Sequence, residues 1–431
     1  MTSLSSVVIR PAKNISGTLR LPGDKSISHR YAMLAAIAEG NTRLENYSTG
    51  RDCASTLGCV RALGCNWQRQ NNGVIDIRGR GAALRAPDAP LDCGNSGSTM
   101  RMLSGILAGQ NFTSELIGDE SLSRRPMARI IAPLTTMGAR ISAASGDRPP
   151  LSIAGGGLKA IDYRMPVASA QVKSCLLFAG LFAVGETRVE EPVRTRDHGE
   201  LALQAFGAEV KRQGNAARIA GGQKLQAIGA TIPGDISSAA FFLCAAALFR
   251  GSRLIINHLL MNPARARLLD FLSQMGLRIS VTQLEEHHGE LAGTVQAEGG
   301  PLRGAIIAGA DSAALIDELP VLAAIAPYTQ DGIEIRDARE LRVKESDRIA
   351  VVAANLRAMG AQVEEREDGL RVLGGQALHG AEMNSHGDHR VAMAFAVAGL
   401  RAHGESRILD SDAADVSYPG FFAVLDELTQ R

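Results

Sequence analysis

Six apolar runs of helical length recur along the chain, and each of them ends at a glycine. Because these runs are apolar nearly all round, they are predicted to be helices in the interior of a domain. A glycine directly after the last apolar residue suits the left-handed backbone that closes a helix, so we expect these glycines to end the helices. The runs are Ser28–Gly40, Thr99–Gly109, Val172–Gly185, Ala239–Gly251, Leu319–Gly332 and Val391–Gly404.

A short strand-like segment and a second, more amphipathic helix follow each apolar run. In five copies this second helix also closes on a glycine, and a predicted β-hairpin comes next. The glycines of the second helices are Gly64, Gly138, Gly207, Gly276 and Gly360. The pattern therefore predicts a unit of helix, strand, helix and two strands that repeats about every 70 residues.

The two halves of the chain also resemble each other. Leu21-Pro22-Gly23-Asp24 recurs 211 residues later (232 − 21 = 211) as Ile232-Pro233-Gly234-Asp235. Three repeats per half predict an α/β fold with two pseudo-symmetric domains, residues 21–231 and residues 232–431 joined by 1–20. The sixth repeat reaches Arg431 without its last strands, and the strand-like segment Val7–Leu19 is expected to supply them.

A polar cluster begins each of the six apolar helices. Helix N-termini that are buried and face one direction present free N–H groups and positive dipole ends, which suits anions. For any single helix, simple N-capping is the favoured explanation of a Ser, Asn or Asp. Six such clusters in register, several with Lys, Arg or Gln beyond what a cap needs, favour a shared anion site. The clusters are Lys25-Ser26, Asn95-Ser96-Gly97-Ser98, Ser169-Ala170-Gln171, Ser237-Ser238, Asp317-Glu318 and Asp388-His389-Arg390.

Two loops that precede second helices add positive charge. Arg124 and Arg125 stand before Pro126, which is expected to begin a helix. In the run from Arg342 to Arg348, helical spacing would bring Lys344 and Arg348 onto one face. A solvated charge run on a surface helix is the alternative.

Composition narrows the function classes. The formal net charge is +1 and aromatic residues make up 4% of the chain, so neither a basic field nor a base-stacking surface for nucleic acid is expected. The six cysteines form no CxxC pair, which favours free thiols in a reducing compartment. No apolar run is long enough for a membrane span and the N-terminus has no signal-peptide pattern, so a cytoplasmic protein is expected. His386 and His389 lack the further ligands of a metal site.

Seven motifs in order resemble the EPSP synthase (3-phosphoshikimate 1-carboxyvinyltransferase) family of enolpyruvyl transferases. They are LPGDKSISHR, GNSGSTMR, RRPMAR, SAQVKS, IDELP, RVKESDR and GDHRVAM. The resemblance implies two domains, each with three copies of a βαβαββ unit around buried parallel helices (an inside-out α/β barrel), and an active site in the interdomain cleft. It also implies transfer of the enolpyruvyl group of phosphoenolpyruvate to the 5-hydroxyl of shikimate 3-phosphate, on the pathway to chorismate and the aromatic amino acids.

The resemblance assigns binding roles residue by residue. Shikimate 3-phosphate is expected to contact Lys25, Ser26, Arg30, Ser169, Ala170, Gln171, Asp317 and Lys344. Phosphoenolpyruvate is expected to contact Lys25, Gly97, Arg125, Gln171, Arg348 and Arg390. Arginine forks suit the phosphates and the carboxylate of these molecules because they bind such groups bidentately.

The reaction needs a proton at C3 of phosphoenolpyruvate while the 5-hydroxyl adds at C2, which calls for a general acid and a general base. Glu345 is expected to donate the proton to C3, and Asp317 is expected to act as the base, helped by Lys25. The structural alternative is that Glu345 only pairs with Arg348. No metal, organic cofactor, nucleic-acid partner or membrane contact is expected, and the chain is expected to be a monomer.

Two other functions compete with this interpretation. The related transferase that acts on UDP-N-acetylglucosamine usually has Lys-Asn where this chain has Lys25-Ser26. A non-catalytic phosphometabolite-binding protein would keep the arginines but lose Asp317 or Glu345, and both are present.

The chain also departs from the family pattern at places that bear on the inhibitor glyphosate. A C-terminal lysine that many members carry is missing from the stretch 415–419. Gly97 favours sensitivity to glyphosate, whereas the motifs Arg196-x-His198-x-Glu200 and Ser169-Ala170-Gln171-Val172-Lys173 are shared with a less sensitive subgroup.

Overall fold

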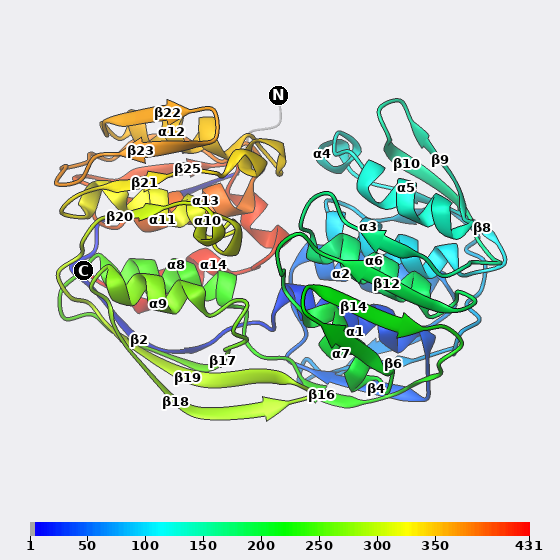
Figure 1. Ribbon diagram of the computed structural model, residues 1–431. Coiled ribbons are helices and arrows are strands. Elements are labelled where there is room, and N and C mark those ends of the chain that lie inside the picture. The colour runs from blue at the N-terminus through cyan, green and yellow to red at the C-terminus, as the bar shows by residue number, and fades with distance from the viewer. Residues whose placement is uncertain (1–4) are drawn as a thin grey trace. The chain divides into compact units, whose positions relative to one another are not determined.

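The computed structural model describes residues 5–431, and its internal contacts divide the chain into two compact units (Figure 1). Unit 1 comprises the described part of Met1–Pro22 together with Pro233–Glu285 and Leu291–Arg431. Unit 2 comprises Gly23–Ile232 and Glu286–Glu290. Residues 1–4, part of the predicted segment 1–20, lie outside the described residues. The sequence-based ranges 21–231 and 1–20 plus 232–431 stay a prediction about domains.

Unit 2 contains three four-stranded sheets of one design. Their orders are β16-β4-β6-β5, β7-β8-β10-β9 and β11-β12-β14-β13, with the first pair parallel and the other pairs antiparallel. The strands are β3 (Ala38–Glu39), β4 (Asn41–Glu45), β5 (Asn66–Arg69), β6 (Ile75–Arg78), β7 (Leu91–Asp92), β8 (Thr113–Ile117), β9 (Arg140–Ala144), β10 (Arg148–Ala154), β11 (Asp162–Arg164), β12 (Glu186–Glu190), β13 (Val210–Gln213), β14 (Ala216–Ala220), β15 (Leu225–Gln226) and β16 (Gly229–Thr231). The first repeat of the unit therefore takes its parallel strand from the end of the same unit.

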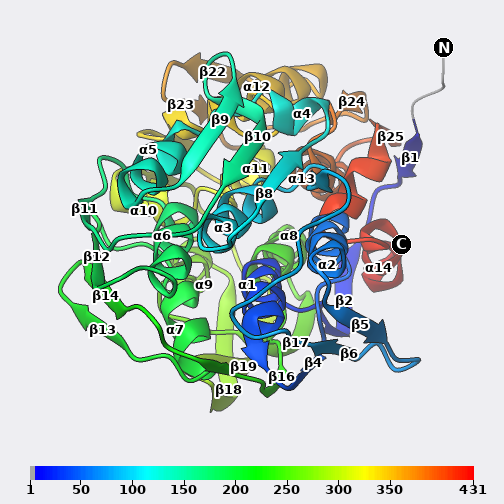
Figure 2. The ribbon, with the colours of Figure 1, turned by 90° about the vertical axis from the view of Figure 1, so that its right-hand side faces the viewer.

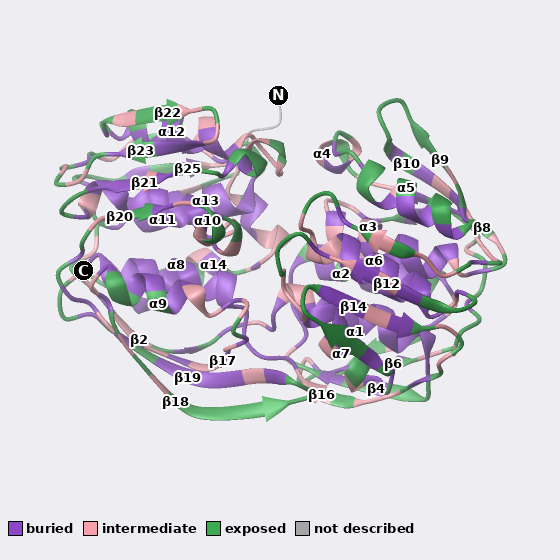
Figure 3. Cartoon of the chain, viewed as in Figure 1, coloured by how far each residue is buried: buried purple, intermediate pink, exposed green. Residues whose placement is uncertain are grey.

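The helices of unit 2 divide into buried and covering ones. They are α1 (Lys25–Ile37), α2 (Arg51–Ala62), α3 (Gly97–Ala108), α4 (Glu120–Ser123), α5 (Ala128–Met137), α6 (Ala170–Gly180) and α7 (His198–Ala205). Helices α1, α3 and α6 are buried along most of their length (Figure 3). Helix α3 packs against both α1 and α6 (Figure 2), so the apolar runs of the sequence form the interior of the unit.

Unit 1 follows the same plan, with strands contributed by both ends of the chain. Its strands are β1 (Ser6–Ile9), β2 (Asn14–Arg20), β17 (Arg253–Leu260), β18 (Arg278–His287), β19 (Glu290–Glu298), β20 (Ala305–Ile307), β21 (Ile333–Ile335), β22 (Val363–Arg366), β23 (Gly369–Val372), β24 (Glu382–Asn384), β25 (Ser406–Leu409) and β26 (Thr429–Gln430). The sheet orders are β20-β21-β23-β22, β18-β19-β17-β2-β26 and β1-β25-β24. Strand β1 pairs antiparallel with β25, and β2 pairs parallel with β17, so the N-terminal segment completes two sheets of this unit.

The buried helices of unit 1 are α8, α11 and α13 (Figure 3). The helical segments of the unit are α8 (Ile236–Ala247), α9 (Arg267–Gln274), α10 (Ala310–Ala314), α11 (Leu319–Ile325), η1 (Ala326–Tyr328), η2 (Arg339–Val343), α12 (Arg348–Ala358), α13 (His389–Gly399), η3 (Ser411–Val416) and α14 (Phe421–Leu428). The three buried helices pack against one another, and side chains at their first residues touch. They therefore begin at one end of the unit and run in the same direction, as the predicted α/β class requires.

The glycines that follow the second helices end them as predicted. Gly64, Gly138, Gly207, Gly276 and Gly360 all have φ between 90° and 111°. Each stands at the end of the helix or one residue past its cap, where a left-handed residue turns the chain out of the helix.

The same expectation is wrong for the apolar runs. Gly109 directly follows α3, but its φ of −83° is helical. Helix α6 ends at Gly180 and Leu181 caps it, whereas Gly185, with φ 106°, lies just before β12. The buried helices end earlier, in turns that are closed by backbone hydrogen bonds. A positive-φ glycine such as Gly185 lies after that end and turns the chain into the next strand.

None of the helices formed by residues 5–431 combines the length and the apolar character needed to cross a lipid bilayer.

Helices α3 and α6 pack closely against each other at Gly105. A Cβ atom at Gly105 would come within 2.0 Å of the carbonyl oxygen of Cys175 in α6. Only a residue without a side chain fits there, since a backbone atom cannot move aside as a flexible side chain can.

We expect Gly105→Ala to lower the free energy of unfolding by about 1–3 kcal/mol or more, because the methyl group overfills this crossing. The measurement is urea unfolding followed by circular dichroism. Gly58→Ala in α2 is the matched control: the position is exposed and no atom lies within 4 Å of a new Cβ there. It should be neutral or stabilise the protein by up to about 1 kcal/mol through helix propensity. Equal unfolding midpoints for the two variants would contradict the close crossing.

Candidate active site

The first turn of α1 presents a lysine that an aspartate holds in place. Asp24 caps the helix by accepting a hydrogen bond from the backbone N–H of Ile27 at 2.9 Å. Lys25 Nζ lies 3.0 Å from Asp52 Oδ2 at the start of α2. The Lys25 side chain retains 18% exposure, whereas that of Asp52 is 7% exposed. The ammonium group is therefore oriented by Asp52 and still accessible to a ligand.

Arg30 carries a buried positive charge between the first turns of α1 and α6. Its guanidinium donates to the carbonyl oxygen of Ser26 at 2.8 Å, to Ser174 Oγ at 2.9 Å and to the carbonyl oxygen of Ala170 at 3.4 Å. Burial lowers the pKa of Arg30 to about 10, and the negative charge of Glu200 acts in the opposite direction. Within residues 5–431 no carboxylate pairs directly with this guanidinium, so its charge can serve an incoming anion.

The starts of α3 and α6 are joined by Gln171. Gln171 Nε2 donates to Ser98 Oγ at 2.8 Å, and Arg101 Nη1 donates to Gln171 Oε1 at 2.9 Å. A Cβ atom at Gly97 would lie 2.7 Å from Arg101 Nη1 and 3.5 Å from Arg125 Nη1, so two guanidinium groups flank this helix start. Arg101 was missed by the sequence analysis. Its position four residues after Gly97, one helical turn on, was the available signal.

Arg125 lies in the loop between α4 and α5. Its Nη2 donates to Asn95 Oδ1 at 2.8 Å and to Ser121 Oγ at 3.1 Å. The expectation that Pro126 begins a helix is wrong, because α5 starts at Ala128. The short helix α4, capped by Asp119, takes up the residues before Arg125 instead and directs its side chain toward Asn95.

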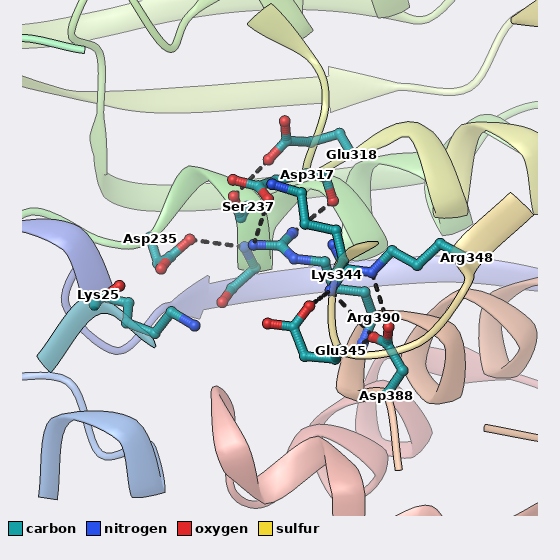
Figure 4. Close-up of polar contacts among 12 residues, drawn as sticks. Lys25, Asp235, Ser237, Asp317, Glu318, Lys344, Glu345, Arg348, Asp388 and Arg390 are labelled. Atoms are coloured by element: carbon teal, nitrogen blue, oxygen red, sulfur yellow. Dashed lines mark hydrogen bonds and ion pairs between the residues drawn. The ribbon is translucent and has the colours of Figure 1, made fainter. Parts of the chain in front are cut away.

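In unit 1, Arg348 is the most deeply buried cation of the predicted site, and it lies beside Asp388 and Glu345 (Figure 4). Its Nε and Nη2 donate to the two oxygens of Asp388 at 2.8 and 3.2 Å, and Nη2 also reaches Glu345 Oε2 at 2.5 Å. Burial acts to lower the pKa of Arg348, but the charges of Asp388 and Glu345 raise it above its usual value. The pairing of Glu345 with Arg348, the alternative weighed from the sequence, is thus present as a contact.

Asp388 organises this group, although the sequence analysis gave it no role in the site. Besides Arg348, its carboxylate accepts from Ser346 Oγ and from the backbone N–H of Arg390, both at 3.0 Å. The side chain is fully buried. One carboxylate therefore caps α13 and orients a buried arginine, and the aspartate of the GDHRVAM motif was the signal.

Asp317 lies between two arginines at the start of α11 (Figure 4). Arg390 Nη1 donates to the carbonyl oxygen of Asp317 at 2.6 Å, and its Nη2 lies 3.8 Å from the carboxylate. Arg265 Nη1 lies 3.8 Å from the other carboxylate oxygen. Arg265 also donates to Ser237 Oγ at 2.5 Å, and Ser237 in turn contacts Glu318 Oε1 at 2.5 Å. The starts of α8, α11 and α13 thus share one polar cluster.

Lys344 and Glu345 do not belong to a helix, which corrects the expectation that Lys344 and Arg348 share a helix face. They lie between η2, which ends at Val343, and α12, which begins at Arg348. Asp347 causes the late start, because its side chain caps α12 by accepting from the backbone N–H of Ala350 at 3.1 Å. Lys344 Nζ lies 3.4 Å from Glu340 Oε1 instead.

A buried ion cluster supports α6 in unit 2. Lys173 Nζ lies 2.7 Å from Glu191 and 2.8 Å from Glu200, and all three side chains are nearly inaccessible. Burial raises the pKa of Glu200, while the charge of Lys173 lowers it. His198 Nδ1 lies 2.6 Å from Glu290 Oε1. Two subgroup motifs seen in the sequence, one ending in Lys173 and one in Glu200, are therefore physical partners.

The predicted site residues form two groups, one in each unit. In unit 2, contacts connect Ser26, Arg30, Gly97, Arg125, Ser169, Ala170 and Gln171 through the starts of α1, α3 and α6, and Lys25 is the chain neighbour of Ser26. In unit 1, contacts connect Asp317, Glu345, Arg348 and Arg390, and Lys344 is the chain neighbour of Glu345. Over the described range 5–431, no three His, Cys, Asp or Glu side chains are grouped as metal ligands would be.

We expect Asp388→Asn to lower the free energy of unfolding by about 3–5 kcal/mol, because it leaves the buried Arg348 without its main counter-charge. Thermal and urea unfolding measure this loss. Asp426→Asn removes an exposed partner of Arg431 and is the matched control, with an expected change below about 1 kcal/mol. If Asp388→Asn were as mild as this control, the charge pair would not hold the group together.

The comparisons with known proteins agree with the motifs over almost the whole chain. A family model described as EPSP synthase (3-phosphoshikimate 1-carboxyvinyltransferase) matches residues 9–425. A relative from Koribacter versatilis (strain Ellin345), named 3-phosphoshikimate 1-carboxyvinyltransferase, is 60% identical over 428 residues, which cover 99% of this chain and 100% of the relative. A relative of the same name from Solibacter usitatus (strain Ellin6076) is 55% identical over 98% of this chain and 99% of its own length.

A solved structure has the same fold. The structure of EPSP synthase from Acinetobacter baumannii superposes with a TM-score of 0.87 at 40% sequence identity and covers 98% of both chains. The fold class predicted from the repeats and the resemblance inferred from the motifs are both confirmed. Matches of this extent, to a chain that carries the seven motifs in order, show that it belongs to the EPSP synthase family.

Proposed function

We propose that this chain transfers the enolpyruvyl group of phosphoenolpyruvate to the 5-hydroxyl of shikimate 3-phosphate, releasing phosphate. The observation that carries the proposal is the gathering of cations that lie in, or contact, the first turns of buried helices, together with two carboxylates suited to proton transfer. The cations are Lys25, Arg30, Arg101 and Arg125 in unit 2, and Arg265, Arg348 and Arg390 in unit 1.

The negative charges of the two substrates match these cations. Each substrate carries a phosphate and a carboxylate, so together they bring several negative charges that need buried or half-buried cations. Arg30, which has no direct carboxylate partner in the described chain, suits shikimate 3-phosphate. Gly97 suits phosphoenolpyruvate, because a position without a side chain lets a ligand approach the helix start and the two guanidinium groups beside it.

The first chemical step is an addition. The 5-hydroxyl oxygen bonds to C2 of phosphoenolpyruvate, its proton passes to Asp317, and the C2=C3 electron pair takes a proton from Glu345 to make a methyl group. The product is a tetrahedral adduct that still carries the phosphate. Arg390 and Arg265, which lie beside Asp317, stabilise its carboxylate form before the proton arrives.

The second step is an elimination that restores the double bond. Glu345, now a carboxylate, removes a proton from the C3 methyl group, the C2–O bond to phosphate breaks, and the proton held by Asp317 leaves with the phosphate. Glu345 can exchange a proton only if it is released from Arg348, to which it lies at 2.5 Å. An anionic substrate that binds Arg348 competes for that guanidinium and weakens the pairing.

All six cysteines of the chain are free and buried. A reducing compartment allows this arrangement. The cytoplasmic location and the monomeric state stay predictions from the sequence.

Phosphate release tests the proposed function directly. Incubated with phosphoenolpyruvate, the protein should release inorganic phosphate only when shikimate 3-phosphate is present, and UDP-N-acetylglucosamine should not replace it. Lys25→Met should lower kcat/KM by about 10²–10³-fold, since it removes a positioned cation. Lys211→Met, at an exposed lysine on β13, should leave the rate unchanged. Binding of both substrates without phosphate release would contradict the proposal and favour a non-catalytic binding protein.

Glu345→Gln should lower kcat by about 10²–10⁴-fold, because the amide cannot exchange a proton with C3. In D₂O, deuterium incorporation at C3 of phosphoenolpyruvate in the presence of shikimate 3-phosphate should fall by the same factor. Glu364→Gln, at an exposed pair with Arg366 on β22, controls for the loss of a surface carboxylate. If Glu345→Gln kept wild-type exchange, Glu345 would be only the ion-pair partner of Arg348.

A further inference from the structure

A continuous chain of four buried polar side chains runs through unit 2 from α1 to the cap of α3. His29 Nδ1 lies 2.6 Å from Thr56 Oγ1, and Thr56 Oγ1 lies 2.7 Å from Thr99 Oγ1. Thr99 Oγ1 lies 2.8 Å from Ser96 Oγ. All four residues are completely inaccessible to solvent.

Four polar groups in an apolar interior need a reason, because apolar side chains of similar shape would be easier to bury. None of the four is among the residues assigned above to substrate binding or proton transfer. A fully connected buried network can have all its hydrogen bonds satisfied in only one arrangement of the helices that it joins, so it holds them in that arrangement. Here it joins α1, α2 and α3.

The direction of the hydrogen bonds follows from the groups at the two ends of this hydrogen-bonded series, Ser96 and His29. Ser96 Oγ accepts from the backbone N–H and from the hydroxyl of Thr99. The Thr99 oxygen then accepts from Thr56, and the Thr56 oxygen accepts from an N–H at Nδ1 of His29. Nε2 of His29 is then unprotonated, and its lone pair has no hydrogen-bond donor in the described chain.

The opposite direction would leave a buried N–H at Nε2 without an acceptor. Unpaired buried N–H groups are rarer than unpaired acceptors, so the first direction is favoured. Burial, with smaller contributions from the charges of Lys25 and Arg30, lowers the pKa of His29 well below its usual value. The ring is therefore neutral and carries one proton.

Both ends of the hydrogen-bonded series are direct sequence neighbours of predicted substrate-binding residues. His29 stands one turn after Lys25 and directly before Arg30. Ser96 caps α3 and directly precedes Gly97, beside which the guanidinium groups of two arginines lie. The chain thus links the α1 residues that suit shikimate 3-phosphate to the helix start that suits phosphoenolpyruvate.

We propose that His29 is a positioning residue for phosphoenolpyruvate. By donating its Nδ1 proton into the chain through Thr56 and Thr99, it fixes the first turn of α3 and with it the place of Gly97 relative to α1. This inference rests on the proposed function, in which Gly97 contacts phosphoenolpyruvate. His29 acts through the helix start and touches neither substrate.

Steady-state kinetics with isosteric variants test the role. Thr56→Val and Thr99→Val each break the chain without changing side-chain volume, and each should raise KM for phosphoenolpyruvate by about 5- to 50-fold. KM for shikimate 3-phosphate should change by less than about 2-fold. The double variant should be no worse than either single variant, because one break already disables the chain.

Two controls separate this role from general destabilisation. Thr42→Val replaces another completely buried threonine of unit 2, whose hydroxyl has no partner in the described chain, and should leave both KM values unchanged. Thr56→Ser keeps the hydroxyl and should restore nearly wild-type KM. Equal increases in both KM values, additive effects in the double variant, or a Thr56→Val enzyme that behaves like Thr42→Val would each overturn the inference.

A measurement without substrates checks the hydrogen-bond direction. The ¹⁵N chemical shifts of the His29 ring should report a neutral Nδ1–H tautomer in the wild type, and this preference should be lost in Thr56→Val. An Nε2–H tautomer in the wild type would contradict the proposed direction. A wild-type protein that released no phosphate would contradict the proposed function, whereas an active wild type with unaffected valine variants would contradict only the role of His29.

Discussion

The structure depends on placing the first turns of buried helices where their unpaired N–H groups and dipole ends can be satisfied. In each unit three such helices begin at one end, and side chains at their starts contact one another. The caps Asp24, Ser96, Ser169, Asp235 and Asp388 satisfy part of this need from within the chain. The positive ends and the added arginines still attract anions, so the requirement that shapes the interior also creates the chemistry of the site.

The two units meet the requirement in different ways. In unit 2 the buried Arg30 donates only to neutral oxygens, and the helix starts are tied by amides and hydroxyls such as Gln171 and Ser98. In unit 1 carboxylates dominate, since Asp388 and Glu345 bind Arg348, and Asp317 faces Arg390. The first arrangement suits recognition of anions, and the second brings proton-exchanging groups close to cations.

Much of the fold could be predicted from the sequence, because apolar periodicity and glycine position report on local structure. The αL glycines after second helices, such as Gly64 and Gly360, follow from backbone sterics alone. The late start of α12 was missed because Asp347 competes as a cap within a dense charge run. Arg101 and Asp388 were missed as site residues since their importance lies in partners from other helices. Spacing within one segment cannot specify such partners.

The strand pairing of unit 1 has a consequence for synthesis on the ribosome. Strand β2 (Asn14–Arg20) lies between β17 and β26, and β26 is formed by Thr429 and Gln430, more than 400 residues later in the sequence (429 − 20 = 409). Unit 2 takes all the strands of its four-stranded sheets from residues 41–231. Unit 2 can therefore complete these sheets before residues 429–430 are synthesised, whereas β2 keeps the edge that pairs with β26 open until then. The connectivity thus sets the earliest point of synthesis at which each sheet can be completed.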